Sequence, residues 1–249
     1  MGQLDNKIAI VTGAGGGIGG AIAVRLAREG AKIAVADIDG ETAKSRAAEI
    51  TRQGGQSFSV VADVTRKISV EQMVQAALDR WGRIDILVNV AGGAQVKPVI
   101  EVSETEWDHI INMNLKSVFL CSQAVLPAMI KQNYGKIVSI SSIYGFTGNA
   151  TRASYAAAKA GVAVFTKSLA LEVVSQGINV NAVAPGRIAT DRVRGHYTDA
   201  EWAERVVQIP MKRAGTPEEI ASTALFLVND ENKYITGQTI HVNGAWLNY

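Results

Sequence analysis

The stretch IVTGAGGGIGGAI, residues 10–22, contains the strongest fold signal in the chain. β-Branched apolar residues precede its glycines and a helical pattern follows them, so it predicts a strand, a tight turn and a helix. Glycines at such a turn let the backbone approach a pyrophosphate, whose charge the helix N-terminus stabilises. No Lys-Ser or Lys-Thr follows, which excludes a Walker loop. The alternative is a tight turn without a ligand, and the surrounding sequence weighs against it.

The glycines fit two spacings, G-x-G-x-x-G over 15–20 and T-G-x-x-x-G-x-G over 12–19; the first is weak by itself. Asp37 ends the next apolar run, eighteen positions after Gly19. A carboxylate there accepts hydrogen bonds from an adenosine ribose 2′-OH and repels a 2′-phosphate. Asp39 is a weaker alternative, because it lies beyond the strand end. Without Arg or Lys in the glycine loop, this pattern favours NAD over NADP as the cofactor.

Short β-branched runs alternate with helical patterns along the whole chain. They lie at residues 7–12, 32–37, 57–62, 84–89, 136–141, 178–184 and 238–243. Most are continuously apolar, as strands covered by helices on both faces are. Capping boxes at 103–106, 198–201 and 216–219 predict three helix starts. We therefore expect an α/β fold: one Rossmann-type doubly wound domain over 1–249, with about seven parallel strands.

Composition narrows the class of protein further. Of 249 residues 47% are hydrophobic and 19% charged, which predicts a large buried core. The net charge of +2 suggests neither nucleic acid nor a membrane as partner. The single cysteine, Cys121, excludes an intramolecular disulfide, and without a signal-peptide pattern we expect a cytoplasmic protein. The histidines at 109, 196 and 241 have no ligand spacing, so no metal is expected.

Tyr155 and Lys159 lie four residues apart in ASYAAAKAGV (153–162) and share one face of a predicted helix. Alone, such a pair more often lies on a surface. The second possibility is a phenol whose proton becomes mobile beside a cation. The rest of the chain decides between them.

Eight motifs, in order, resemble those of the short-chain dehydrogenase/reductase family over essentially the whole chain. They are T-G-x-x-x-G-x-G at Thr12–Gly19, Asp63-Val64, NVAG at Asn89–Gly92, Asn114 in NMNLKSVF, Ser142 in VSISS, Y-x-x-x-K at Tyr155–Lys159, P-G-x-x-x-T at Pro185–Thr190 and YITGQTIHVNG at 234–244. Two departures are Val90 in place of a second Asn and NGAW at 243–246 in place of D-G-G. The resemblance implies that Tyr155 and Lys159 are catalytic.

The resemblance implies a catalytic set of Asn114, Ser142, Tyr155 and Lys159. Tyr155 would be the acid/base, and Lys159 with the positive nicotinamide would lower its pKa. Ser142 would hold the substrate oxygen and Asn114 a proton-relaying water. Ser141 and Asn112 are alternatives for the serine and asparagine roles, but their spacing fits the family motifs less well. Tyr144 and Tyr134 lack a Lys four residues later, so we expect them to be a pocket-wall residue and a turn residue.

The resemblance also implies a set of cofactor-binding residues. They are Gly13, Gly17, Ile18, Gly19, Asp37, Asp63, Val64, Asn89, Ala91, Gly92, Tyr155, Lys159, Pro185, Gly186, Ile188 and Thr190. The break at 186–211 is expected to be a substrate lid. Its Arg187, Arg192 and Arg194 either meet an anionic substrate or are solvated lid charges.

Together these features predict an NAD(H)-dependent oxidoreductase that interconverts a secondary alcohol and a ketone: a polyol, sugar, hydroxy acid or cyclic alcohol. The chain also resembles 3-oxoacyl-carrier-protein reductases, so a 3-oxoacyl-thioester reductase is the alternative; many of these use NADPH, which Asp37 disfavours. A non-catalytic NAD-sensing module and a redox-neutral lyase or epimerase are alternatives from other classes. The resemblance further implies a homotetramer acting on a small molecule.

Overall fold

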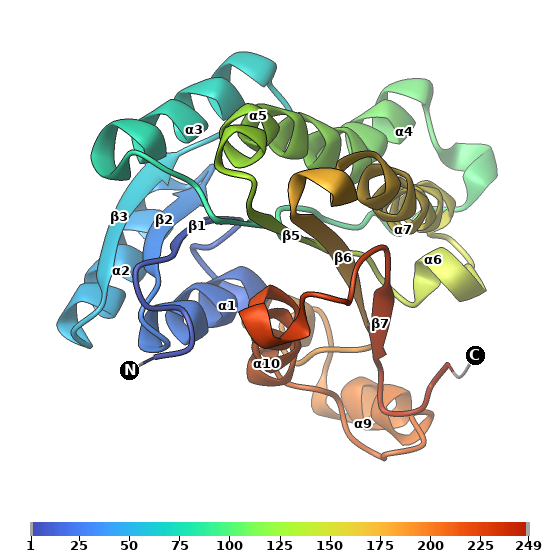
Figure 1. Cartoon of the computed structure of the whole chain (residues 1–249). Helices are drawn as coiled ribbons and strands as arrows, with labels where there is room; N and C mark the ends of the chain where they lie inside the picture. The colour runs from blue at the N-terminus through green and yellow to red at the C-terminus, as the bar shows by residue number, and fades with distance from the viewer. Residues whose placement is uncertain (1, 248–249) are drawn as a thin grey trace.

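The computed structural model describes residues 2–247 and contains one seven-stranded parallel sheet (Figure 1). Its strands, in spatial order, are β3 (Gln56–Val61), β2 (Lys32–Asp37), β1 (Ile8–Thr12), β4 (Ile86–Asn89), β5 (Gly135–Ile140), β6 (Ile178–Pro185) and β7 (Thr239–Val242). Every residue of β1, β4, β5 and β6 is buried. The continuously apolar runs are therefore the central strands, as expected of a sheet covered on both faces.

Two layers of helices enclose the sheet (Figure 1). One layer consists of α1 (Gly17–Arg28), α2 (Gly40–Arg52) and α10 (Pro217–Val228), and the other of α3 (Lys67–Trp81), α5 (Ser117–Gln132) and α7 (Ala153–Val173). Shorter helices are α4 (Glu104–Ile111), α6 (Tyr144–Thr147), α8 (Asp191–Arg194) and α9 (Asp199–Val207). A π-helical turn at Asn112–Lys116 joins α4 to α5. The prediction of a doubly wound Rossmann-type fold is confirmed.

The capping boxes explain where three helices begin. The side-chain oxygens of Ser103, Thr198 and Thr216 each accept a hydrogen bond from the backbone N–H three residues later. The Glu at that later position accepts a hydrogen bond from the backbone N–H of the cap residue. The joined run Glu104–Gln132 is long and apolar enough by composition to cross a membrane, yet 44% of its most apolar window is buried. Its Leu120, Cys121 and Val125 pack in the core over β4 and β5. It serves here as a helix of the second layer.

The strand order reverses direction between β1 and β4, which lie side by side at the middle of the sheet. In such sheets a crevice opens beyond the carboxyl ends of the two central strands. Thr12 ends β1, and its Oγ1 accepts the N–H groups of Val90 and Ala91 just after β4, at 3.0 and 3.3 Å. This contact ties the glycine loop to the NVAG loop and so positions the two sides of the crevice.

The segment 186–211 carries α9, whose start the capping box at 198–201 predicts, and also the single turn α8, which no motif predicted. Thr190 caps α8 by accepting the Val193 N–H, and Thr198 caps α9. Local capping therefore shapes this segment, although apolar burial in it is sparse. A β-bridge between Ile188 and Gly215 joins the beginning of this segment to the residues that follow it.

Candidate active site

The glycine loop forms a cradle open to a ligand. Gly13 has a φ of +62°, and a Cβ there would lie 2.9 Å from the Ala91 Cα. A Cβ at Gly19 would lie 2.1 Å from the Gly13 carbonyl oxygen, so α1 can approach β1 only without a side chain. Gly16, the N-cap of α1, offers no side-chain cap, and the first turn holds no acidic residue. Its N–H groups therefore suit a phosphate, and the loop fits a dinucleotide.

Replacing Gly19 by Ala is expected to lower the free energy of unfolding by about 1–3 kcal/mol, because the added methyl group overlaps backbone. Denaturant unfolding measures the change. Gly16→Ala is the matched control, since nothing lies within 4 Å of a Cβ there. It is expected to change stability by less than about 0.5 kcal/mol. Equal losses in the two variants would contradict this view of the loop.

Asp37 lies at the carboxyl end of β2 beside this loop. Its Oδ2 accepts the Gly15 N–H at 2.9 Å, and its Oδ1 accepts the Asp39 N–H at 3.1 Å. The rival Asp39 is committed as the N-cap of α2, where its Oδ1 accepts the N–H groups of Glu41 and Thr42. Of the two carboxylates, Asp37 is thus the one held against the glycine loop.

The other predicted dinucleotide residues lie along the same crevice with different side-chain surroundings. Asp63 bonds within its own turn to Thr65, and Val64 is buried. Asn89 is turned inward, with Nδ2 donating to Ser139 Oγ at 3.2 Å and a buried Oδ1 that has no partner. The side chain of Asn89 therefore lies in the interior beside Ser139, and its backbone is the part that faces the crevice.

The segment after β6 closes the crevice from the lid side. The Pro185 carbonyl accepts the Ile143 N–H at 3.1 Å, and Ile188 is buried in the core. The methyl group of Thr190 lies 3.4 Å from where a Gly17 Cβ would be, so the start of the lid sits on the glycine loop. The structure brings these predicted positions together around one crevice.

Helix α7 carries Tyr155 and Lys159 on one face. The Lys159 Nζ lies 5.7 Å from the centroid of the Tyr155 ring and donates to the Ile140 carbonyl at 2.7 Å. Ser142 follows β5, is buried, and lies close enough to the Tyr155 hydroxyl to act on its pKa, while its Oγ accepts the Tyr144 N–H at 3.2 Å. The rival Ser141 donates instead to the Lys159 carbonyl at 2.8 Å, so it secures the helix backbone. A serine, a phenol and an ammonium therefore meet at one point.

Asn114 belongs to the π-helical turn and is fully buried. Its Nδ2 donates to the carbonyls of Gly93 and Ile110 at 2.8 and 2.9 Å, and its Oδ1 accepts the Gly93 N–H. A Cβ at Gly92 would lie 2.6 Å from this Oδ1 and 3.5 Å from the Lys159 Nζ. The amide and the ammonium therefore converge on the same small volume beside Gly92.

Burial shifts the ionisation of both central groups. It lowers the pKa of Lys159 to about 8, with the charge of Arg192 acting in the same direction. Burial also raises the pKa of Tyr155, against the hydrogen bond to Ser142 and the charges of Arg152 and Arg192. The expected lowering of the Tyr155 pKa is therefore not seen in the protein alone, because desolvation outweighs the groups that lower this pKa, Ser142, Arg152 and Arg192. Tyr155 is held as a neutral proton donor.

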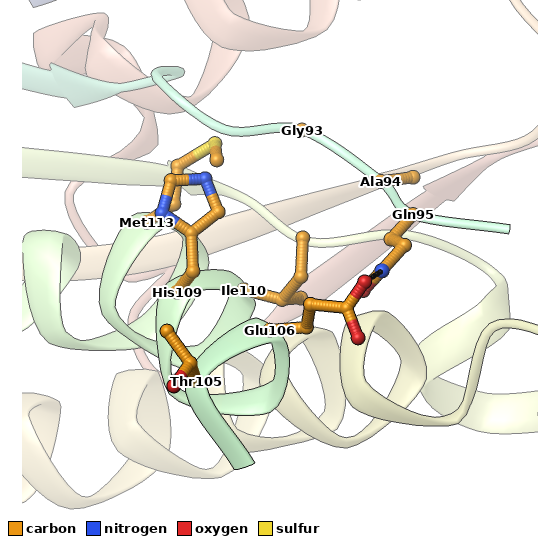
Figure 2. Close-up of a pocket in the computed structure, with 8 residues that line it drawn as sticks. All are labelled: Gly93, Ala94, Gln95, Thr105, Glu106, His109, Ile110 and Met113. Atoms are coloured by element: carbon orange, nitrogen blue, oxygen red, sulfur yellow. Dashed lines mark hydrogen bonds between the residues drawn. The ribbon is translucent and has the colours of Figure 1, made fainter. Parts of the chain in front are cut away.

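A cavity of about 510 Å³ adjoins the site between residues 93–95 and α4 (Figure 2). Met113 and His109 project into it from the helix, below the strand-four loop. Glu106 lies at its edge and is bonded to Lys97; hydrogen bonds from the Ser103 backbone and from Lys97 lower its pKa to about 2. The edge of this cavity thus holds an ion pair rather than a free charge. Among residues 2–247 no group of three or more His, Cys, Asp or Glu could hold a metal.

The structure adds site residues that the sequence reasoning overlooked. Arg152 is the N-cap residue of α7 and precedes Tyr155 by three positions, a spacing that already places both on one helix face. Trp246, from the divergent NGAW segment, contacts Tyr144 edge-to-face at 6.2 Å. No local sequence pattern predicts that contact, because it joins the NGAW segment at 243–246 to the loop after Ser142.

A doubly wound sheet with an open glycine cradle and a converging Ser–Tyr–Lys–Asn group defines a dinucleotide-dependent oxidoreductase. Known proteins agree: a family model described as enoyl-(acyl carrier protein) reductase matches residues 13–246. The chain belongs to the short-chain dehydrogenase/reductase family, whose members bind a nicotinamide dinucleotide. It is an enzyme acting on CH–OH groups.

Three relatives show where in the family the chain lies. It is 45% identical to the 3-oxoacyl-(acyl-carrier-protein) reductase FabG of Staphylococcus epidermidis, over 96% of this chain and 98% of that protein. The same enzyme of Vibrio cholerae is 45% identical over 98% of both chains, and the Synechocystis 3-oxoacyl-(acyl-carrier-protein) reductase 44% over 98% of both. The solved structure of gox2181 superposes with a TM-score of 0.95 at 36% identity, covering 98% of this chain and 96% of that one.

These relatives correct the expectation of a polyol, sugar, hydroxy acid or cyclic alcohol dehydrogenase, which is wrong. All three are named 3-oxoacyl reductases and are matched over nearly their whole length. The physical reason for the error is that the catalytic set of Asn114, Ser142, Tyr155 and Lys159 can serve any secondary alcohol or ketone. Asp37 bears on the cofactor, and it does not distinguish one ketone substrate from another.

Proposed function

We propose that this protein reduces the ketone of a 3-oxoacyl thioester, with NADH as the hydride donor. The observation that carries the proposal is the meeting of Ser142, Tyr155 and Lys159 at the carboxyl edge of the sheet, beside the glycine cradle. Relatives at 44–45% identity that bear the name 3-oxoacyl reductase support the substrate class. The carboxylate of Asp37 supports NADH, because a 2′-phosphate at the Gly15 turn would meet it directly.

In the proposed reaction the ketone oxygen accepts hydrogen bonds from the hydroxyl groups of Ser142 and Tyr155. The bound nicotinamide supplies the hydride that forms the new C–H bond. Tyr155 gives its proton to the oxygen as negative charge develops there, and its raised pKa keeps that proton available. The Lys159 ammonium stabilises the phenolate that remains. The phenolate then takes back a proton from Lys159, and Lys159 would be reprotonated from solvent through a water held by Asn114, whose Oδ1 lies near Gly92.

The test is loss of NADH with 3-oxohexanoyl-N-acetylcysteamine, compared with NADPH. Reduction in wild type that is lost in Ser142→Ala, with the 3-hydroxyacyl thioester as product, would support the proposal. Reduction of the matching 2-enoyl thioester instead would assign the site to C=C chemistry, as the family model's description suggests. NADH binding without turnover of either compound would sink the proposed activity.

Ketone reduction is expected to fall as the pH rises through about 8. Lys159 stabilises the phenolate only while it is charged, and its pKa is lowered to about 8 by burial. Below that pH the ammonium is present, and above it the charge is lost. Lys159→Arg keeps a charge at all these pH values, so its lower rate is expected to lack this alkaline limb. If the rate of Lys159→Arg also falls as the pH rises through about 8, the decrease belongs to a group other than Lys159.

We also propose a homotetramer in the cytoplasm, as family resemblance suggests. Apolar side chains on the outer faces of α5 and α7 support association, because Leu171 is 81% exposed, Val164 61% and Phe119 42%. Sedimentation equilibrium measures the assembly. A monomer at micromolar concentration would contradict it.

A further inference from the structure

Three arginines stand around the mouth of the site without a carboxylate partner. They are Arg152 at the start of α7, Arg187 just after β6 and Arg192 in α8. Among residues 2–247 no Asp or Glu oxygen lies within 4.0 Å of their charged nitrogens, whereas Arg194 pairs with Asp199 and Arg213 with Glu219. The arginines of this region are thus of two kinds, and only Arg194 and Arg213 have a carboxylate partner.

Arg152 lies beside the reacting groups. Its Cζ is 5.8 Å from the centroid of Tyr144, which follows Ser142 by two residues. Tyr155 lies three positions further along α7, on the same helix face as Arg152. The charge of Arg152 opposes the raised pKa of Tyr155, which agrees with their closeness.

Arg187 is held by aromatic rings. Its Cζ lies 5.7 Å from the centroid of Tyr197, 5.9 Å from that of Trp202 and 5.6 Å from that of Trp246. Trp246 in turn contacts Tyr144. Rings orient a guanidinium without removing its net charge. The Nε of Arg187 is buried and has no hydrogen-bond partner, so a donor remains unused.

Arg192 reaches across the crevice from the lid. Both of its terminal nitrogens lie 3.4 Å from the Gly92 carbonyl, in the loop that follows β4. Its side chain is exposed, and its charge lowers the pKa of Lys159. Arg192 thus lies at the open side of the same volume in which Lys159 and Asn114 converge.

We infer that Arg152, Arg187 and Arg192 form a receptor for an oxyanion carried by the substrate, a carboxylate or a phosphate. Guanidinium groups bind such oxygens through paired charge-assisted hydrogen bonds, and three uncompensated charges at one opening are costly unless an anion joins them. The inference rests on the proposed function, and it adds the charge of the substrate.

Two sources of the oxyanion are compatible with a thioester: the far end of the acyl chain or the carrier arm. Three probes separate them. Neutral 3-oxohexanoyl-N-acetylcysteamine is the reference, 3-oxohexanedioyl-N-acetylcysteamine adds a carboxylate to the acyl end, and 3-oxohexanoyl-4′-phosphopantetheine adds a phosphate to the thiol end. The quantity measured is kcat/KM with NADH for each probe.

In wild type at least one charged probe is expected to exceed the neutral one by about 10- to 100-fold in kcat/KM. Arg192→Met is expected to lower the ratio of kcat/KM for that charged probe to kcat/KM for the neutral probe to about one, and Arg192→Lys to restore part of this ratio. Arg28→Met, at the end of α1, is the control that should keep the advantage. Equal rates for all three probes, or an equal loss on all three in Arg192→Met, would overturn the receptor.

A second measurement keeps the receptor testable if no thioester is reduced and the proposed function fails. Trp202 and Trp246 lie against Arg187, so intrinsic fluorescence reports an arriving anion. Titration of the NADH-loaded protein with hexanedioate and with 4′-phosphopantetheine should give a saturable change that weakens in Arg192→Met. Neutral hexanediol should give none. An anion titration without any change, or one that Arg192→Met leaves as it is, would overturn the receptor.

Discussion

Replacing Tyr155 by Phe is expected to reduce kcat for ketone reduction by about 10²- to 10⁴-fold, the usual contribution of a positioned general acid. The ring stays, so packing of α7 against β6 should be preserved. What disappears is the hydroxyl that lies beside Ser142 and holds the transferable proton. Steady-state loss of NADH measures kcat, and fluorescence of bound NADH measures cofactor affinity, which should change less than about threefold.

Tyr144→Phe is the matched control. Tyr144 lies two residues after Ser142 and packs against Trp246, but no lysine follows four residues later. The Tyr144→Phe variant also loses one phenolic oxygen near the site, and its kcat is expected to stay within about threefold of wild type. Full activity in Tyr155→Phe, or an equal loss in both variants, would remove Tyr155 from the acid role.

The double variant Asp37→Ser with Ile38→Arg is expected to lower the ratio of kcat/KM for NADH to that for NADPH by about 10²- to 10³-fold. The change removes a charged acceptor for the ribose and supplies a cation for a 2′-phosphate. Ile38 is 68% exposed, so Arg can extend there without disturbing the core. Rates with the two cofactors on one thioester give the ratio.

Asp39→Ser separates the cofactor effect from a general loss of structure. Asp39 caps α2, and Ser is itself a good cap, so stability should change little and the cofactor ratio not at all. A shift in the ratio for Asp39→Ser would transfer the discriminating role to that residue. An unchanged ratio in the double variant would remove Asp37 from cofactor selection.

Much of the fold follows from local sequence. Continuously apolar runs predicted buried parallel strands, and three S/T-x-x-E boxes placed the starts of α4, α9 and α10 at the residues where the structure begins them. These signals are local because each depends on hydrogen bonds or burial within a few positions. The segment 186–211 was less predictable, because α8 is a single turn stabilised by one Thr190 cap.

The substrate class was not accessible in the same way. The tetrad specifies how a proton and a hydride move, and the same four side chains serve many ketones. Charge at the opening depends on where Arg152, Arg187 and Arg192 end up, and these come from α7, from the end of β6 and from α8. Only the relatives overturned the first choice of substrate.

By itself the sequence determined the parallel sheet, the glycine turn, the acidic residue at the end of β2 and the pairing of Tyr155 with Lys159 on one helix face. Each of these is a matter of spacing along the chain, where geometry repeats every two or 3.6 residues. Tertiary structure alone decided that the Asn114 Oδ1 and the Lys159 Nζ both lie beside Gly92, and that Arg192 reaches the Gly92 carbonyl from a hundred residues away. Such contacts depend on how whole layers pack, and no local period encodes them.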